Sequence, residues 1–240
     1  MNFQKFCFAL LVFAVIAVGS ASAASCSNAT VNGVWGYLVG AAVGQFTADG
    51  KGGITNGSQT VSQNGVIETQ TFTGTYSVSK NCTGSLTVNL TGGGTATANF
   101  VIDDSKKGAQ IIDTISGIVA GGFGLAQGAV TCGATGKKAT FAANLLGKIA
   151  NTGPVAYVSQ VILDGKGNIS GSGTFDVNGT IVTAPFTGTY TENADCTGSA
   201  QVTPSGFSTL NFNLVVVNAG KEILLIETDA NTIVVGNMQQ

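Results

Sequence analysis

The chain has 240 residues, of which 44% are hydrophobic and only 9% are charged, and its formal net charge is −2. This balance excludes an intrinsically disordered chain, which needs low hydrophobicity and high charge, and it offers no basic patch for nucleic acid. The sequence contains neither histidine nor arginine, so histidine-dependent catalytic triads, imidazole metal sites and bidentate guanidinium clamps are excluded.

The N-terminus predicts a secretory signal peptide over residues 1–24. A short cationic stretch precedes an apolar run from Phe6 to Val18, and small residues follow, so we expect cleavage after Ala23 or Ala24. The apolar run is shorter than the ~20 residues that cross a bilayer, and no stable membrane span is expected after cleavage. The predicted location is therefore outside the cytoplasm: secreted, periplasmic or on the cell surface.

The remainder of the chain is an internal duplication. Three phrases recur at a nearly constant distance: FTGTY at 72–76 and 186–190, CTGS at 82–85 and 196–199, and DGKG at 49–52 and 164–167. Cys26 matches Cys132 at a shorter distance, which predicts an insertion of about nine residues around 148–156 in the second copy. The duplication predicts two domains, over 25–128 and 129–240, each long enough for its own core.

Each copy predicts a series of short β-strands. Runs rich in Val, Ile, Thr, Phe and Tyr alternate with Gly, Asn and Asp turns. In the first copy the expected strands cover 33–39, 43–48, 53–63, 66–79, 84–90, 96–103, 109–116 and 118–127. An antiparallel meander of this kind hides its edges by closing. The predicted fold class is all-β, with two tandem up-and-down β-barrels or barrel-like sandwiches. One sixteen-stranded outer-membrane barrel is the alternative, although its aromatic girdles would need more than one tryptophan and four tyrosines.

Four cysteines follow the predicted leader, and they allow three pairings. The duplication favours the pairing that repeats, Cys26 with Cys82 and Cys132 with Cys196. An exported protein meets the oxidising conditions that such bonds need. Lipoprotein processing at Cys26 stays open as an alternative. Because the cysteines are widely spaced and form no C-x-x-C pair, we expect disulfides and neither a metal site nor a cofactor.

The first strand resembles that of a known barrel family. Gly33, Val34 and Trp35 match the Gly-x-Trp signature of lipocalins, and Thr228 with Asp229 resembles part of the lipocalin Thr-Asp-Tyr motif. The chain lacks the arginine that packs over the lipocalin tryptophan. The resemblance therefore extends to the broader group of eight-stranded calycin-like barrels, which includes allene oxide cyclase-like barrels, and to secreted bacterial repeat proteins of unassigned function. It implies a barrel fold and export.

Repeated aromatic residues are the candidate ligand-binding residues: Trp35, Phe72, Tyr76, Phe186 and Tyr190. Inward-facing aromatic rings with a phenol donor can line a cavity for a small apolar ligand. The competing interpretation is that the same rings fill two cores.

Acidic residues give a second set of candidates. Asp113 and Glu227 occupy equivalent places in two apolar strands, where an inward-facing acid would have a raised pKa. Orientation toward solvent is the simpler interpretation, and acids in different barrels form no catalytic pair, so we assign no catalytic residue. Asp49 and Asp164 supply one carboxylate per loop, too few for the oxygen ligands of calcium, and are interpreted as turn residues.

Three functions are consistent with these features. The favoured hypothesis is a secreted, non-enzymatic β-barrel protein that binds a small apolar ligand. The second is a structural or adhesive extracellular protein, in which the β-domains act as spacers. The third is a cyclase- or isomerase-type enzyme that uses a carboxylate or a tyrosine. An apolar cavity next to Tyr76 or Tyr190 would favour binding, and a buried acid in that cavity would favour the enzyme.

Overall fold

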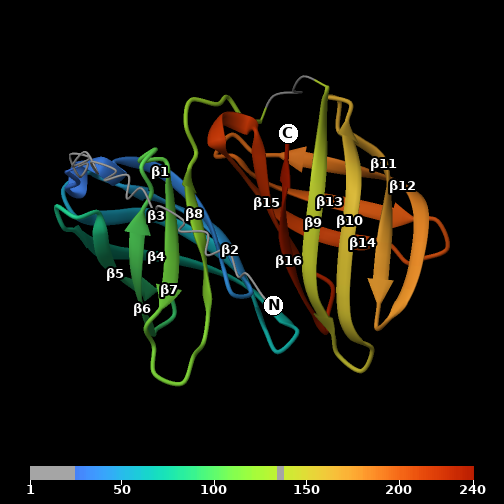
Figure 1. Cartoon of the computed structure of the whole chain (residues 1–240), viewed down its shortest axis with the longest axis horizontal. Helices are drawn as coiled ribbons and strands as arrows, with labels where there is room; N and C mark the ends of the chain where they lie inside the picture. The colour runs from blue at the N-terminus through green and yellow to red at the C-terminus, as the bar shows by residue number, and fades with distance from the viewer. Residues whose placement is uncertain (1–24, 134–137) are drawn as a thin grey trace, which may run out of the picture.

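The computed structural model describes residues 25–133 and 138–240, so the predicted signal peptide and its cleavage site lie outside the described residues. Figure 1 shows that the described chain consists of β-strands joined by turns, with two short 3₁₀ helices, η1 (Asn28–Val31) and η2 (Asn218–Gly220). In this part of the chain, no helix has the length and apolar character needed to cross a membrane.

The strands form two closed barrels in tandem, in which each strand pairs antiparallel with the next and the last pairs with the first. The first barrel contains β1 (Gly33–Val39), β2 (Ala42–Ala48), β3 (Gly53–Gln63), β4 (Val66–Val78), β5 (Thr83–Leu90), β6 (Thr95–Ile102), β7 (Gly108–Asp113) and β8 (Gly121–Ala126). The second contains β9 (Ala139–Ile149), β10 (Gly153–Leu163), β11 (Asn168–Val177), β12 (Thr180–Glu192), β13 (Thr197–Pro204), β14 (Leu210–Val217), β15 (Glu222–Glu227) and β16 (Thr232–Gln239). The predicted fold class is confirmed, and the single sixteen-stranded barrel is not formed.

Both predicted disulfides are present, one in each half of the chain. Cys26 bonds to Cys82, and Cys132 bonds to Cys196. Each bond joins the segment before the first strand of a barrel to the turn between its fourth and fifth strands. Cys82 and Cys196 both have a φ of 66°, so the repeat extends to the backbone conformation of this turn. In the chain-entropy model, closing loops of this length contributes about 4 kcal/mol per bond.

The two barrels differ most at their first hairpin. Strands β9 and β10 have 11 residues each, whereas β1 and β2 have 7 each. The insertion expected around 148–156 therefore falls in the β9–β10 hairpin. This hairpin makes the second barrel deeper at the end where its tip lies. The predicted strand over 109–116 ends earlier, at Asp113, whose Oδ1 accepts a hydrogen bond from the Ile115 backbone N–H.

The barrels lie side by side and pack through their outer surfaces (Figure 1). The first barrel contributes the outer side of β8, β1, β2 and β3, here called the β1 face. The second contributes the outer side of β14, β15 and β16, here called the β14 face. Their apolar centre is made by Val43, Val215, Val217, Leu224 and Ile226, with Leu38, Phe123, Leu125 and Val235 packed against it.

Hydrogen bonds surround this apolar centre. Asn213 Nδ2 donates to Thr60 Oγ1 at 2.9 Å, and Ser62 Oγ donates to the Thr232 carbonyl at 2.6 Å. The β3–β4 turn also docks on the second barrel, because the Asn231 N–H donates to the Gly65 carbonyl at 2.8 Å. Together with the apolar centre, these bonds fix one orientation of the two barrels.

Candidate functional site

The interior of the first barrel is nearly filled by side chains. Trp35, Phe72 and Tyr76 are buried in its core, as alternation along their strands predicts. The space that remains among Trp35, Tyr76 and their neighbours has a volume of about 30 Å³. That is room for about one water molecule, so this interior holds no ligand-sized cavity.

Helix η1 lies across one end of the first barrel and binds the polar atoms of two predicted site residues. Trp35 Nε1 donates to the Val31 carbonyl at 2.8 Å, and the Tyr76 hydroxyl donates to the Asn28 carbonyl at 3.1 Å. Asn28 Oδ1 also accepts from the Val78 N–H at 2.8 Å. The indole and the phenol are thus already hydrogen-bonded to the chain's own backbone, and both hold this end of the barrel closed.

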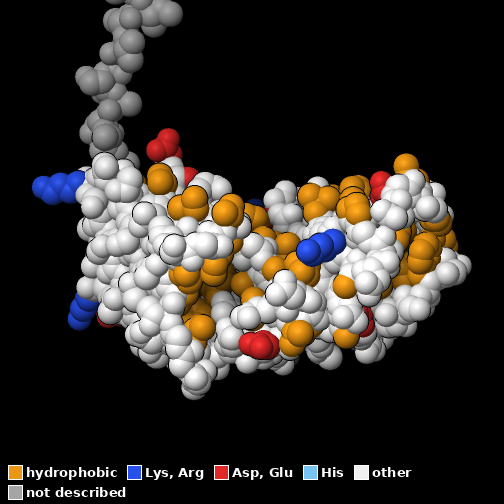
Figure 2. Space-filling model, turned by 90° about the horizontal axis from the view of Figure 1, so that it is seen from below, with side chains coloured by type: hydrophobic (Ala, Val, Ile, Leu, Met, Phe, Trp, Pro, Cys, Tyr) orange, Lys and Arg blue, Asp and Glu red, His pale blue; other side chains and the backbone are white. Residues whose placement is uncertain are grey.

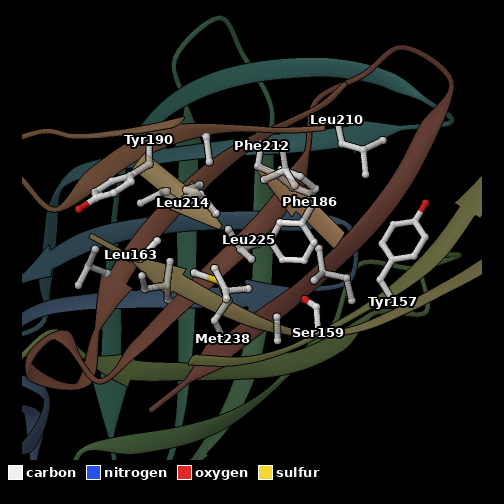
Figure 3. Close-up of a pocket in the computed structure, with 18 of the residues that line it drawn as sticks. Tyr157, Ser159, Leu163, Phe186, Tyr190, Leu210, Phe212, Leu214, Leu225 and Met238 are labelled. Carbon is white, nitrogen blue, oxygen red and sulfur yellow. The ribbon is translucent and has the colours of Figure 1, made fainter. Parts of the chain in front are cut away.

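The interior of the second barrel contains a larger cavity, with a volume of about 90 Å³. Phe186 and Tyr190, two of the predicted site residues, line it. Figure 3 shows Tyr190 at one end of the cavity and Tyr157 at the other, with Ser159, Leu225 and Met238 between them. Apart from a few polar atoms, the walls are aliphatic and aromatic.

Several inward positions beside the cavity hold smaller residues in the second barrel than in the first. The pairs, with the first-barrel residue named first, are Trp35 and Phe141, Tyr37 and Ala143, Phe46 and Val161, Leu86 and Ala200, and Phe100 and Leu214. Other inward positions hold larger residues in the second barrel, since Phe212 replaces Ala98, Tyr157 replaces Ala42, Leu163 replaces Ala48, Met238 replaces Gly124 and Ile223 replaces Ala109. The two interiors thus distribute their large side chains differently, and the second leaves the larger space.

Four polar side chains line the cavity: Tyr157, Ser159, Tyr190 and Glu192. Burial raises the pKa of Tyr157 to about 12, and the nearby carboxylates of Glu227 and Asp229 add to the shift. Burial also raises the pKa of Tyr190 and that of Glu192. At neutral pH both phenols are therefore neutral and can donate a hydrogen bond to a ligand.

Glu227 is a buried acid inside the second barrel. Alternation along β15 turns it to the same side as Ile223 and Leu225, which line the cavity. Its side chain is 1% exposed, and its Oε2 is the one buried side-chain polar atom among the described residues without a hydrogen-bond partner. Burial, and secondly the charge of Asp229, raise the pKa of Glu227 to about 7.

The equivalent acid of the first barrel is in a different environment. Asp113 is half-buried, and its Oδ1 accepts the Ile115 N–H at 2.7 Å. The first barrel has no extension like the β9–β10 hairpin, which carries Tyr157 and deepens the second barrel. The two acids that the repeat places at one position are therefore a turn residue in one copy and an interior acid in the other.

The remaining acidic candidates are Glu192, which lies beside a disulfide, and the two turn residues Asp49 and Asp164. Cys132, Glu192 and Cys196 bring potential ligand atoms within 4.8 Å of one another, but both sulfurs belong to the disulfide, so only Glu192 could ligate an ion. Asp49 Oδ1 accepts the backbone N–H groups of the residues at 51, 52 and 53, which lowers its pKa. Asp164 has a similar role in its own turn, in agreement with the interpretation of both as turn residues.

The structure separates the predicted site residues into two groups. Phe186 and Tyr190 lie at the cavity of the second barrel, whereas Trp35, Phe72 and Tyr76 belong to the filled core of the first. Sequence reasoning missed Tyr157, Ser159 and Met238. A comparison of the two copies, position by position, contains a signal for the cavity, because several large inward residues of the first copy are small in the second.

No protein-family model matches the chain, and no curated protein matches it. Two eight-stranded antiparallel barrels in tandem are compatible with the calycin-like architecture. The function is therefore inferred from the cavity and from the residues around it.

Proposed function

We propose that this chain is an exported two-barrel protein whose second barrel binds a small apolar molecule, while the first barrel supports it structurally. The observation that carries the proposal is the contrast between the two interiors, about 90 Å³ of space in one and about 30 Å³ in the other. Both disulfides support export, since such bonds persist in oxidising compartments.

The size of the cavity sets the class of ligand. A dry apolar cavity of about 150 Å³ binds benzene or xenon, and drug-sized ligands need about 300 Å³ or more. The cavity of about 90 Å³ therefore fits a compact apolar molecule, or one end of a slender chain. Met238 is the lining residue whose side chain can rearrange to accommodate a larger ligand, because it is unbranched and flexible.

Exchange of residues between the two copies tests the proposal. Val161→Phe and Ala200→Leu place the first barrel's larger residues in the second barrel, and Phe46→Val and Leu86→Ala do the reverse. Xenon and benzene are the probes, and binding is measured as chemical-shift changes of methyl groups in the two barrels. We expect the wild type to bind both probes in the second barrel, the first pair of substitutions to abolish this binding, and the second pair to create binding in the first barrel. Probe shifts that are equal in the wild type and in the filled variant would contradict the proposal.

Native mass spectrometry of protein purified from its own host, before and after organic extraction, identifies the natural ligand. A co-purifying apolar molecule that extraction removes is the expected result. Protein that carries no such molecule before extraction, and that also fails to bind xenon and benzene, would leave the structural hypothesis as the better one. In that case both barrels would act as spacers.

One observation favours a second candidate function. Glu227 is buried on the inner side of β15 and is not itself a lining residue of the cavity. Its pKa is raised to about 7, and it acts electrostatically on Tyr157, which lines the cavity. A general base with a pKa near neutrality is suited to proton transfer, which is the chemistry of an isomerase. Deuterium exchange at the carbon next to the carbonyl of a small ketone measures this activity. A rate that Glu227→Gln abolishes while xenon still binds would identify an enzyme, and equal rates for variant and wild type would exclude this role for Glu227.

A further inference from the structure

The interface between the barrels joins two different surfaces. The first barrel uses its β1 face and the second uses its β14 face. Because the barrels are copies, each also carries the surface that its neighbour uses. The strands equivalent to β14 and β15 are β6 and β7 of the first barrel, and those equivalent to β8, β1 and β2 are β16, β9 and β10 of the second. The outer sides of β6, β7, β9 and β10 are exposed, whereas β16 also contributes Val235 to the interface within the chain. We call these two surfaces the free β6 face and the free β9 face.

Such a head-to-tail contact can in principle repeat without limit. A heterologous interface leaves one unused half at each end of the assembly, and a second copy can add there to form an open filament or a ring. The occupant that fits either free face is therefore a second copy of this chain, docked as the chain's own two barrels are docked. Figure 2 shows apolar side chains gathered where the two lobes meet and others on the outer surface of both lobes.

The free β6 face retains part of the apolar centre. Val101 and Ile112 are equivalent to Val215 and Ile226, and they are 53% and 58% exposed. They lie beside a groove of about 550 Å³ on this surface. Two other apolar positions have changed, since Asp103 replaces the equivalent of Val217 and Gln110 replaces that of Leu224; both residues are exposed.

On the free β9 face, too, polar residues replace apolar residues of the interface. The cross-strand pair Leu38 and Phe123 is replaced by the equivalent pair Asn144 and Asn237. Gln239 replaces the equivalent of Leu125, and its Nε2 and the Nδ2 of Asn237 donate to Glu222 Oε1 at 3.1 and 2.6 Å. These amides are thus held in a polar network at the centre of the surface.

The free β9 face also differs from the β1 face in the space that it leaves for a docked barrel. Gly36 lies against the second barrel, where a Cβ would come within 2.4 Å of Val217 Cγ1. The equivalent residue of the second barrel is Ala142, which has that Cβ. The free β9 face therefore lacks the counterparts of Leu38, Phe123 and Leu125, and it also lacks the shallow spot that Gly36 provides on the β1 face.

We propose that these replacements confine the chain to one pair of barrels by blocking the addition of a second copy at either free face. Burial of Asp103, Gln110, Asn144, Asn237 or Gln239 against an apolar surface would remove polar groups from water. This costs free energy even though Asp103, Asn237 and Gln239 keep hydrogen bonds within the chain. Val101, Ile112 and Val158 keep the apolar character of their counterparts and are exposed. Both faces thus keep some of the apolar residues of the interface, and their polar residues prevent docking.

Restoration of the apolar residues in the full, disulfide-bonded chain tests this proposal. One variant carries Asp103→Val and Gln110→Leu, and a second carries Ala142→Gly, Asn144→Leu and Asn237→Phe. We expect each variant alone, like the wild type, to have the mass of one chain by light scattering. An equimolar mixture of the two should show twice that mass. A chain with all five substitutions should form larger assemblies whose mass rises with concentration.

A control variant distinguishes specific docking from nonspecific association through added apolar side chains. Thr73→Leu with Thr75→Leu adds apolar side chains to exposed positions on β4, outside both free faces, and should not associate with either restored variant. The proposal is overturned if the wild type itself assembles, if the two restored variants do not associate, or if the control associates equally well. Fluorescence of Trp35, the single tryptophan, verifies that the first barrel of each variant is folded.

The reverse substitution keeps the test decisive if a restored variant fails to fold. Val217→Asp with Leu224→Gln places the polar residues of the free β6 face into the interface within the chain. We expect the barrels to separate, so that the maximum dimension in small-angle scattering increases and the Asn231 N–H exchanges faster with solvent, while both barrels keep their strands. Barrels that stay packed in this variant would show that these polar residues do not block docking.

Discussion

Replacement of Glu227 by leucine is the most direct test of how the second barrel is built. The carboxyl is buried, Oε2 has no partner within the described structure, and the pKa is raised from the usual 4.5 to about 7. A raised pKa means that the folded state binds the proton more tightly than the unfolded state does. The stability that protonation contributes is therefore complete below about pH 4.5 and is lost as the pH rises through about 7.

The magnitude follows from the shift. One pKa unit corresponds to about 1.4 kcal/mol, so the wild type should lose on the order of 3 kcal/mol of unfolding free energy between pH 4 and pH 8 through this group. Leucine cannot ionise and has a similar size. The Glu227→Leu variant should therefore exceed the wild type in stability by an amount that grows by about 3 kcal/mol over the same interval.

The assay is urea denaturation at pH values from 4 to 8 with the disulfides intact, followed by circular dichroism for both barrels and by Trp35 fluorescence for the first. Asp113→Asn is the matched control, because this acid holds the equivalent position and is half-buried with a hydrogen bond to backbone. The Asp113→Asn variant keeps Glu227, so its stability should fall by the same amount as that of the wild type over this interval. A stability difference between Glu227→Leu and wild type that stays constant from pH 4 to 8 would refute a buried, titrating Glu227.

Two further predictions concern the framework. Gly65 and Gly179 occupy equivalent turns with φ of +86° and +85°, but only at Gly65 would a Cβ come within 2.6 Å of the Asn231 backbone. Gly65→Ala should therefore cost about 1–3 kcal/mol more than Gly179→Ala in urea denaturation, and equal costs would contradict docking of this turn. Cys132→Ser with Cys196→Ser should lower the unfolding free energy by about 4 kcal/mol; an unchanged midpoint under oxidising conditions would show that this disulfide does not stabilise the barrel.

The sequence by itself determined the framework of this protein. The repeated phrases predicted two similar domains, and the equivalent cysteines selected one of the three pairings. Turn residues and alternation predicted antiparallel strands and closure. These features are local or periodic, so they can be read along the chain. They predicted that Phe186 and Tyr190 face an interior, because alternation fixes the direction of a side chain.

The tertiary structure decided what each interior and surface does. A cavity depends on the summed volume of side chains from eight strands, so the space beside Tyr190 appears only when Val161, Ala200 and their neighbours are assembled. The burial of Glu227 depends on a hairpin far away in sequence. The choice of which outer face is covered depends on the partner barrel. Periodicity fixes the direction in which a side chain points, whereas packing between distant segments determines what it meets there.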